Sequence, residues 1–465
     1  MTTTGNYSAS DTESGGYVPI DLAPERWDEI VDIDEWAFLN PWLPEERAAS
    51  KGAFVWDRAR GIAIQDARHG IPGELVAVRC SYPFQMLVPG GERVPTSGLS
   101  WVGVHPGHRR RGLLTAMIRE HFDHALARGE MLSVLTASEP KIYQRFGYGL
   151  GTWHLRAKFG RGDELRDVAG ADEFNVRLER LQREHHAELM ADLQRLERRP
   201  GAIVRDGEAI TTNLFAADAN ERPQEEPRRI AIVSAPDGHP QGFAVFRRKA
   251  AAEWSGCGGE VVVLNFVTTS AAAARRLWGV LFDLDLTSEI TVTSLPLDDR
   301  LLWLVKDQRA PKAIIEDDLW VRILDVARAL EARAYESAVN IVIEVTDYYL
   351  SANAGLWRIT TAPVDTAAPV DNAEPGESTT FKDELVRMGS AHTAKVSKID
   401  EVEGDLAAVP DLSIGIQELS AAYLGGVTIH TLTEAGLVTE LTAGAARLLS
   451  VAMQSPQAPA STFHF

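Results

Sequence analysis

The chain has 465 residues, of which 45% are hydrophobic and 24% are charged, proportions typical of a globular protein in water. It is longer than the roughly 250–300 residues at which a single hydrophobic core stops growing, so about three domains are expected. A formal net charge of −19 at pH 7 disfavours nucleic acid as a partner, because phosphate would be repelled. The charge favours cationic ligands such as amines, although an acidic composition also serves solubility alone.

Several further protein classes are disfavoured. No apolar run approaches the roughly 20 residues needed to span a bilayer. The opening MTTTGNYSASDTESGG is small, polar and acidic, which predicts a disordered tail over residues 1–16 rather than a signal peptide. Cys80 and Cys257 are the only cysteines, and neither they nor the histidines have the spacing of metal ligands. We expect a cytoplasmic protein with no metal centre and no membrane partner.

The first third of the chain, from Tyr17, alternates between strand and helix patterns. Apolar residues at helical spacing predict helices, and alternating or short buried runs between turn residues predict strands. The expected elements are a helix over 24–38, strands over 54–64 and 75–83, a hairpin over 86–95, a strand over 98–104, a helix over 111–128, a strand over 131–137, a short helix over 138–146 and a closing strand over 153–159. This order indicates an α+β domain over residues 17–163.

A weaker copy of the same order follows over residues 164–311. It comprises a hairpin over 230–247, a strand over 260–267, a helix over 271–283 and a strand over 290–294. The turn before its helix reads TTSAAAA and lacks arginine and glycine. A repeat that kept the fold and lost a ligand loop would look this way, as would a chance similarity of two α/β segments.

A third α+β domain is expected over residues 312–465. It begins with a strand and a helix in LWVRILDVARALEARAY and continues with a strand over 341–345. Residues 360–405, rich in Ala, Pro, Thr and acids, predict a mobile loop. Helices are expected over 413–424 and 434–451, before an extended tail that ends on Phe465.

The strongest chemical signal is HPGHRRRGLLT at residues 105–115, between a buried strand and an amphipathic helix. A helix N-terminus presents unpaired N–H groups and partial positive charge. Gly112 leaves room for a phosphate, and the arginines add charge-assisted bonds. The segment is therefore predicted to hold a pyrophosphate; the alternative is a solvated basic turn.

The same run resembles the acyl-CoA loop of GNAT acetyltransferases, Arg/Gln-x-x-Gly-x-Gly/Ala. Arg109, Gly112 and Leu114 stand at its marked positions, with Leu114 in place of the usual small residue. The segments LSWVGVHPGHRRRGLL, ASEPKIYQRFGYG and LWVRILDVARALEARAY, with the terminal Phe, resemble the enhanced intracellular survival (Eis) family. The resemblance implies two fused GNAT folds, the second degenerate and non-catalytic, then a sterol-carrier-protein-like domain, assembled as a homohexamer.

The resemblance also implies an activity and a co-substrate. Family members transfer acetyl groups from acetyl-CoA to amino groups of aminoglycosides, polyamines or lysine side chains. The residues that match the family's acetyl-CoA contacts are Val102, Gly103, Val104, Arg110, Arg111, Gly112, Leu113, Leu114, Thr115, Ser138 and Glu139. The free N–H and C=O groups of a strand end suit the pantetheine amides, and one N–H can polarise the thioester carbonyl.

Two proton movements accompany acetyl transfer to an amine. Tyr143 matches the family's general acid, and a phenol with an ordinary pKa of about 10 suits protonation of a departing thiolate. Tyr148, five residues on, is the competing residue. The family's base is the C-terminal carboxylate, here that of Phe465; His464 is a second possible base, and a frayed terminus is the structural alternative.

Weaker features remain open. Trp36, Phe38, Phe84 and His464 match segments that line the amine side in the family, with core packing an equal alternative for the aromatic residues. Two other functions compete with acetylation of a cationic amine: an acyl-CoA- or lipid-binding regulatory protein with little catalysis, and a transferase of longer acyl groups.

Overall fold

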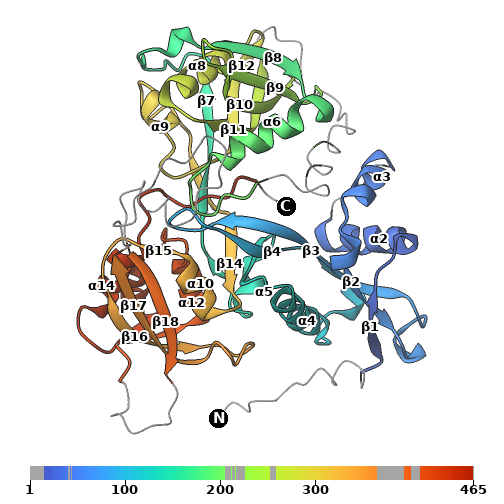
Figure 1. Ribbon diagram of the computed structural model, residues 1–465. Coiled ribbons are helices and arrows are strands. Elements are labelled where there is room, and N and C mark those ends of the chain that lie inside the picture. Colours follow the sequence, from blue (N-terminus) through green and yellow to red (C-terminus); the bar gives the residue numbers. More distant parts are fainter. Residues whose placement is uncertain are drawn as a thin grey trace.

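The computed structural model describes residues 15–39, 42, 44–204, 211, 215, 226–251, 258–363, 392–399, 409–463 and 465. Within these residues the chain forms three sheets with their own helices, here termed the first, second and third units (Figure 1). The expected layout of two similar α+β units followed by a third is thus observed. Most of the expected disordered tail, residues 1–14, lies outside the described residues.

The first unit contains a mixed sheet in the order β1-β2-β3-β4-β5-β14-β6. The expected hairpin is longer than predicted, because β3 and β4 pair along nearly their whole length. The region expected as a strand over 54–64 begins as a short helical turn, and only its end is a strand. The elements are β1 Tyr17–Asp21, α2 Trp27–Phe38, α3 Pro44–Ala53, β2 Arg60–Ile64, β3 Leu75–Leu87, β4 Arg93–Val104, α4 Leu113–Ala127, β5 Leu132–Thr136, α5 Pro140–Gln144, β6 Gly149–Leu150 and β14 Leu319–Ile323.

Helices α2 and α4 pack on opposite faces of this sheet. Ile30 and Ile33 of α2 lie in a cluster with Val78 and Cys80 of β3, whereas α4 packs on the face that presents Ala77. Successive side chains of a strand point to opposite faces, so one strand serves both layers. The sheet is therefore buried on both sides, and a helix N-terminus follows directly from β4.

The second unit repeats this layout with the sheet order β13-β7-β12-β11-β10-β9-β8. The hairpin, strand, helix and strand expected here are confirmed. The helix α8 buries a stripe that includes Leu277, Trp278 and Leu281. The elements are β7 Trp153–Gly160, β8 Asn175–Arg180, α6 Arg183–Arg195, β9 Arg229–Ser234, β10 Pro240–Lys249, β11 Gly259–Thr268, α8 Ala271–Phe282, β12 Thr287–Leu295, α9 Leu301–Leu304 and β13 Ile314–Asp317.

The third unit differs most from expectation. A strand, β18, lies within the region expected as a mobile loop, whose residues 364–391 and 400–408 are outside the described residues. The helix expected over 413–424 begins as β19, which pairs in parallel with β16. The elements are α10 Val326–Ala332, β15 Ala334–Tyr335, β16 Asn340–Thr346, β17 Gly355–Pro363, β18 His392–Ile399, β19 Leu412–Gly415, α12 Ile416–Ala422, α13 Ile429–Glu434, β20 Val438–Glu440 and α14 Ala445–Met453.

Two strands belong to sheets other than those expected. β7, expected to close the first domain, lies between β12 and β13 of the second unit. β14, expected in the third domain, lies between β5 and β6 of the first unit. The reason is a ribbon in which β6–β7 runs antiparallel to β13–β14 and passes from one sheet into the other. The domain boundaries at 163 and 311 stay predictions, but the sheets do not divide there.

The ribbon crosses between the sheets at Thr152 and Asp318. The Thr152 hydroxyl donates a 2.8 Å hydrogen bond to the Asp318 carboxylate and accepts one of 2.8 Å from the N–H of Leu319. Asp318 is 2% exposed. Because a buried carboxylate is costly without partners, these bonds fix the crossing point.

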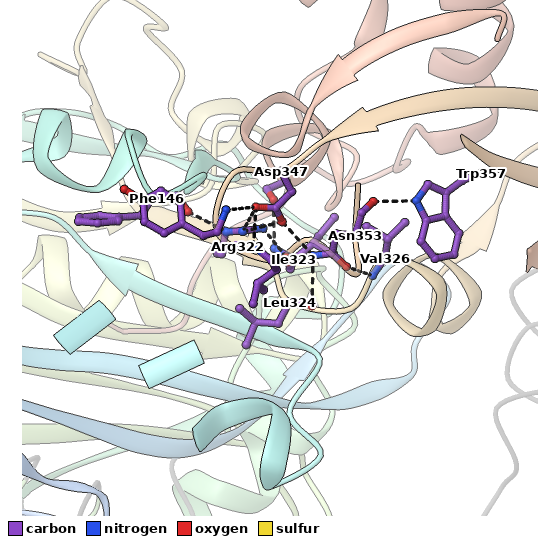
Figure 2. A network of polar contacts seen from close by, with 11 residues as sticks. Phe146, Arg322, Ile323, Leu324, Val326, Asp347, Asn353 and Trp357 are labelled. Carbon is purple, nitrogen blue, oxygen red and sulfur yellow. Dashed lines mark hydrogen bonds and ion pairs between the residues drawn. The ribbon is translucent and has the colours of Figure 1, made fainter. Parts of the chain in front are cut away.

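A buried ion pair joins the first unit to the third (Figure 2). Arg322 of β14 donates to both oxygens of Asp347 at 2.8 and 2.7 Å, and through Nε to the carbonyl of Phe146 at 2.8 Å. Asp347 also accepts from the side-chain amide of Asn353 at 3.0 Å. The guanidinium thus connects the third unit to the turn that follows α5.

Removing one partner should leave the other charge buried and uncompensated. We expect Asp347→Ala to lower the free energy of unfolding by about 3–5 kcal/mol, measured by urea unfolding. The control is Asp192→Ala, which removes an exposed i,i+3 ion pair with Arg195 and should have a far smaller effect. Equal stability of the two variants would contradict a structural role for the buried pair.

Candidate active site

The end of β4 is shaped by a β-bulge. Trp101 has a left-handed φ of 57°, and the β3–β4 register shifts between Val78 and Cys80. A bulge re-aims backbone groups that a regular ladder would use. The parallel pairing of β4 with β5 ends at Gly98 opposite Val134, so the residues expected to meet acetyl-CoA, Val102, Gly103 and Val104, follow the point where the two strands part.

The loop after β4 leads into the uncapped N-terminus of α4. Gly112 is the N-cap, with φ 80° and no side-chain cap, and a Cβ built on it would meet no atom within 4 Å. Arg110 holds a left-handed φ of 62°, a conformation rarely adopted by a non-glycine residue. The helix therefore begins uncapped at a residue with open surroundings, with exposed Arg109–Arg111 beside it.

The predicted loop residues differ in whether their side chains or only their backbone groups are open to a ligand. The Arg111 side chain lies 2.8 Å from the Nδ1 atom of His69 and over the ring of Tyr17. Leu113 and Leu114 turn their side chains into the apolar clusters of the first unit, so only their backbone groups are available to a ligand. Thr115 is half-buried in the first turn of α4.

The second unit lacks this arrangement at the corresponding helix. The N-cap of α8 is Ser270, and its side chain accepts a 3.2 Å hydrogen bond from the N–H of Ala273. A capped N-terminus has already used one of its free donors. Of the two helices, only α4 combines a glycine N-cap with neighbouring arginines.

Tyr143 follows β5 on the short helix α5. Ser138 and Glu139, which precede α5, are exposed, whereas Tyr143 is half-buried. Desolvation, with a smaller contribution from the charge of Glu139, raises the pKa of Tyr143 to about 12. No described residue forms a hydrogen bond with its hydroxyl, and its ring packs edge-on against Tyr148 at 5.9 Å. The Tyr143 hydroxyl is thus protonated and available.

Tyr148, the competing residue, has a different environment. It is fully buried, and its hydroxyl lies 2.7 Å from Ser133 Oγ, which in turn lies 2.8 Å from His121 Nε2. Burial raises the pKa of Tyr148 further than that of Tyr143. These contacts occupy the Tyr148 hydroxyl inside the core, as expected of a structural residue.

Phe465 lies at the end of β5. The Thr136 hydroxyl donates a 3.0 Å hydrogen bond to an oxygen of Phe465, and the Phe465 ring packs edge-on against Phe84 at 4.6 Å and Tyr82 at 6.3 Å. The terminal residue is therefore held beside the segment that carries Tyr143. His464 lies outside the described residues.

The aromatic residues expected on the amine side fall in different places. Phe84 is buried and touches Phe465. Trp36 and Phe38 are exposed at the end of α2, with Trp36 packed edge-on against His105 at 5.4 Å.

The sequence gives no indication of the contact between Thr136 and Phe465, since a threonine at a strand end carries no signal of its own.

The described residues contain neither a membrane-spanning helix nor a cluster of metal-binding side chains. Within them, no helix has the length and apolar character needed for a membrane crossing. No group of three or more His, Cys, Asp or Glu side chains in the same part of the chain has a geometry that could hold a metal ion.

Family models match all three units. Residues 20–151 and 201–323 each match an acetyltransferase (GNAT) domain, and residues 326–461 match a sterol carrier protein domain. A Streptomyces avermitilis protein described as an uncharacterized N-acetyltransferase is 35% identical over 425 residues, which cover 89% of this chain and 91% of the relative. The N-acetyltransferase Eis of Mycobacterium tuberculosis is 32% identical over 361 residues, which cover 74% of this chain and 84% of Eis.

The chain belongs to the Eis family of GNAT N-acetyltransferases. The fold of the crystal structure of Eis1 from Mycobacterium abscessus agrees over 97% of this chain and 100% of that one, with a TM-score of 0.74 at 27% identity. The protein is accordingly an N-acetyltransferase, and GNAT acetyltransferases use acetyl-CoA as acetyl donor.

The Gly112 position gives the first test of the α4 N-terminus. We expect Gly112→Asp to raise the Kd for acetyl-CoA at least about tenfold, because a carboxylate would repel a nearby phosphate by on the order of 1–4 kcal/mol. Isothermal titration calorimetry would measure the Kd. Gly238→Asp is the matched control, since Gly238 also has a left-handed φ, +88°, and open surroundings but lies in the second unit. An unchanged Kd in Gly112→Asp would remove this loop from the binding site.

Proposed function

We propose that the first unit acetylates amino groups of cationic substrates by direct transfer from acetyl-CoA, with Tyr143 as general acid and the Phe465 carboxylate as general base. The observation that carries the proposal is the hydrogen bond from Thr136 to Phe465. It holds the terminal residue at the end of the strand whose continuation bears Tyr143. Phe465 then lies at the end of β5 and Tyr143 on the helix that follows it, beyond the point where β4 and β5 cease to pair.

The described residues fit the co-substrate. Acetyl-CoA would lie along Val102–Val104, where β4 no longer pairs with β5 and that edge can bind the pantetheine amides. Its pyrophosphate would meet Arg110 and the N–H groups of Gly112–Thr115, and Ser138 and Glu139 would border the opposite side. This assignment rests on an uncapped helix N-terminus with open space in front of it.

Each proton has a defined donor and acceptor. The neutral amine forms the new C–N bond to the acetyl carbon while the C–S bond breaks, and the sulfur takes the proton of the Tyr143 hydroxyl. The amine gives up its extra proton to the Phe465 carboxylate, directly or through water. A terminal carboxyl has an ordinary pKa of about 3.3–3.7, so it is ionised at neutral pH and also attracts a cationic substrate.

The substrate class follows from charge and family. A net charge of −19 favours aminoglycosides, polyamines or lysine side chains over anionic acceptors. A thiol-release assay with acetyl-CoA against these three groups would identify the class, and longer acyl-CoA donors in the same assay would test the acyl preference. No release with any amine would favour a binding role instead. A homohexamer in the cytoplasm is part of the same proposal.

The two tyrosines are separated by one pair of substitutions. We expect Tyr143→Phe to keep the ring packing and lower kcat about 10²–10⁴-fold through loss of the proton donor, with little change in acetyl-CoA affinity. Tyr148→Phe removes a buried hydrogen bond and should affect stability more than kcat. A larger loss of kcat in Tyr148→Phe would assign the acid to Tyr148.

The pH profile adds a second measurement on Tyr143. Because an acid must be protonated to act and the pKa of Tyr143 is raised to about 12, kcat/KM should not fall through its ionisation below about pH 10. An alkaline fall centred below pH 9 that disappears in Tyr143→Phe would contradict this environment.

The terminal carboxylate can be moved in either direction. Deleting Phe465 moves it back by one residue, and appending one Gly moves it forward while the Phe465 ring stays in the sequence. Both changes should lower kcat at least about 10²-fold, because a catalytic group misplaced by about 1 Å can cost this much, with acetyl-CoA affinity retained. Full activity with an uncleaved C-terminal tag would exclude this base and bring His464 forward.

A further inference from the structure

The C-terminal segment takes an unusual route to the first unit. After α14 the chain leaves the third unit and runs beneath the second unit to the centre of the molecule, where the C-terminus lies beside β3 and β4 (Figure 1). It is an extended segment with prolines at 456 and 459. Chain ends of this kind fray unless they are tied down, so the contacts along the route decide where Phe465 lies.

Arg199 and Asp298 bind the backbone of the first part of the segment. They pair with each other at 2.5 Å. Arg199 also donates to the carbonyl of Ala458 at 2.5 Å, and Asp298 accepts from the N–H of the same residue at 2.9 Å. Both backbone polar groups of Ala458 are therefore bound by one ion pair, and both partners belong to segments of the second unit.

Ala460 and Ser461 form backbone hydrogen bonds with Pro200 and with the crossing ribbon. The N–H of Ala460 donates to the carbonyl of Pro200 at 3.0 Å, and the N–H of Ser461 donates to Asp318 at 3.0 Å. Gly201 allows the close approach, because a Cβ on it would lie 3.1 Å from the Ala460 oxygen. The segment thus passes directly over the point where the two sheets exchange strands.

Asn265 of β11 also contacts the segment. Its side-chain amide donates a 2.9 Å hydrogen bond to the carbonyl of Thr462. The parallel pairing of β11 with β12 ends at Val263 opposite Val292, so Asn265 follows the point where these strands part. In the first unit, the residues proposed to meet acetyl-CoA follow the corresponding point.

We propose that the second unit is a holder for the C-terminal segment, with Asn265 and the Arg199–Asp298 pair as positioning residues for the Phe465 carboxylate. This inference rests on the proposed function of Phe465 as general base. It gives the second unit a role in the reaction: its strand edge binds the chain's own tail instead of a nucleotide.

The positioning requirement is physical. Thr136 and the aromatic contacts of Phe465, with the Phe463 ring on Phe84 at 5.8 Å, hold only the end of the segment. A free extended segment before it would sample many positions, and fixing each residue has an entropic cost. Contacts at Ala458, Ala460, Ser461 and Thr462 fix the preceding backbone before the substrate arrives. Preorganisation of this kind affects the rate of the chemical step more than the binding of a co-substrate elsewhere.

The experiment combines kinetics with hydrogen exchange on the full-length protein. Asn265→Asp replaces the donor by an acceptor of the same shape, and Asp298→Ala removes one half of the grip on Ala458. Matched controls are Gln241→Glu, an amide-to-acid change on the neighbouring strand β10, and Glu164→Ala, which removes the exposed Lys306 ion pair of the second unit. Thermal unfolding of each variant would exclude global loss of structure.

We expect both test variants to lower kcat at least about tenfold, with the KM for acetyl-CoA within about twofold of the wild type. Amide exchange in a peptide covering residues 458–463, followed by mass spectrometry, should become faster in both. The controls should match the wild type in all three measurements. Wild-type kcat in both test variants, or a fall in kcat without faster exchange, would overturn the holder role.

The outcome is distinguishable from failure of the proposed base. If deletion of Phe465 leaves kcat unchanged, the base assignment is wrong and the holder has no catalytic consequence. If the deletion lowers kcat while Asn265→Asp and Asp298→Ala do not, the base stands and the holder is wrong.

Discussion

The hydrogen bonds between Thr152 and Asp318 fix the point on which the architecture depends. At this point the ribbon β6–β7/β13–β14 leaves the first sheet and enters the second, and here Asp318 also accepts the N–H of Ser461. One buried carboxylate thus relates two sheets and the C-terminal segment. A shift at this crossing would move β14, and with it Arg322, relative to the turn after Tyr143.

The two GNAT folds share one layout and differ at the end of the strand that leads into the main helix. Each has a strand that parts from its parallel neighbour and then leads into a helix. In the first unit the helix starts at a glycine with no cap and arginines nearby, and a charged ligand can approach. In the second unit the helix is capped by Ser270, and the strand edge contacts a peptide segment. The difference lies in a few loop residues, because the cores that position the loops are built alike.

The predictable part of the protein was the part with local signals. The loop at residues 105–115 combines a strand, a basic glycine-containing turn and an amphipathic helix within one stretch of sequence, so its position at the start of α4 followed directly. Tyr143 and Tyr148 could not be told apart by sequence, because their difference is set by burial and by contacts with Ser133 and His121. Family resemblance supplied the ranking, and the buried hydroxyl of Tyr148 supplies a physical reason for it.

The unpredictable part depended on contacts remote in sequence. The strand β14 reads as the start of a new domain, and its pairing with β5 some 180 residues earlier leaves no local pattern. The partners of the tail, Arg199, Asn265 and Asp298, are ordinary polar residues until the fold brings them to Ala458 and Thr462. The β19 segment reads as helix because its apolar run continues into α12, but pairing with β16 decides otherwise.

The strand exchange has a consequence for synthesis of the protein. The ribosome synthesises β5 long before β14. The edge of β5 that pairs with β14 therefore stays unpaired while the second unit is being synthesised. Exposed strand edges promote association between chains, and domains usually fold as they are made. Here the first sheet cannot be completed in that order. Its completion is delayed until the ribbon returns, so the first and second units complete their sheets together.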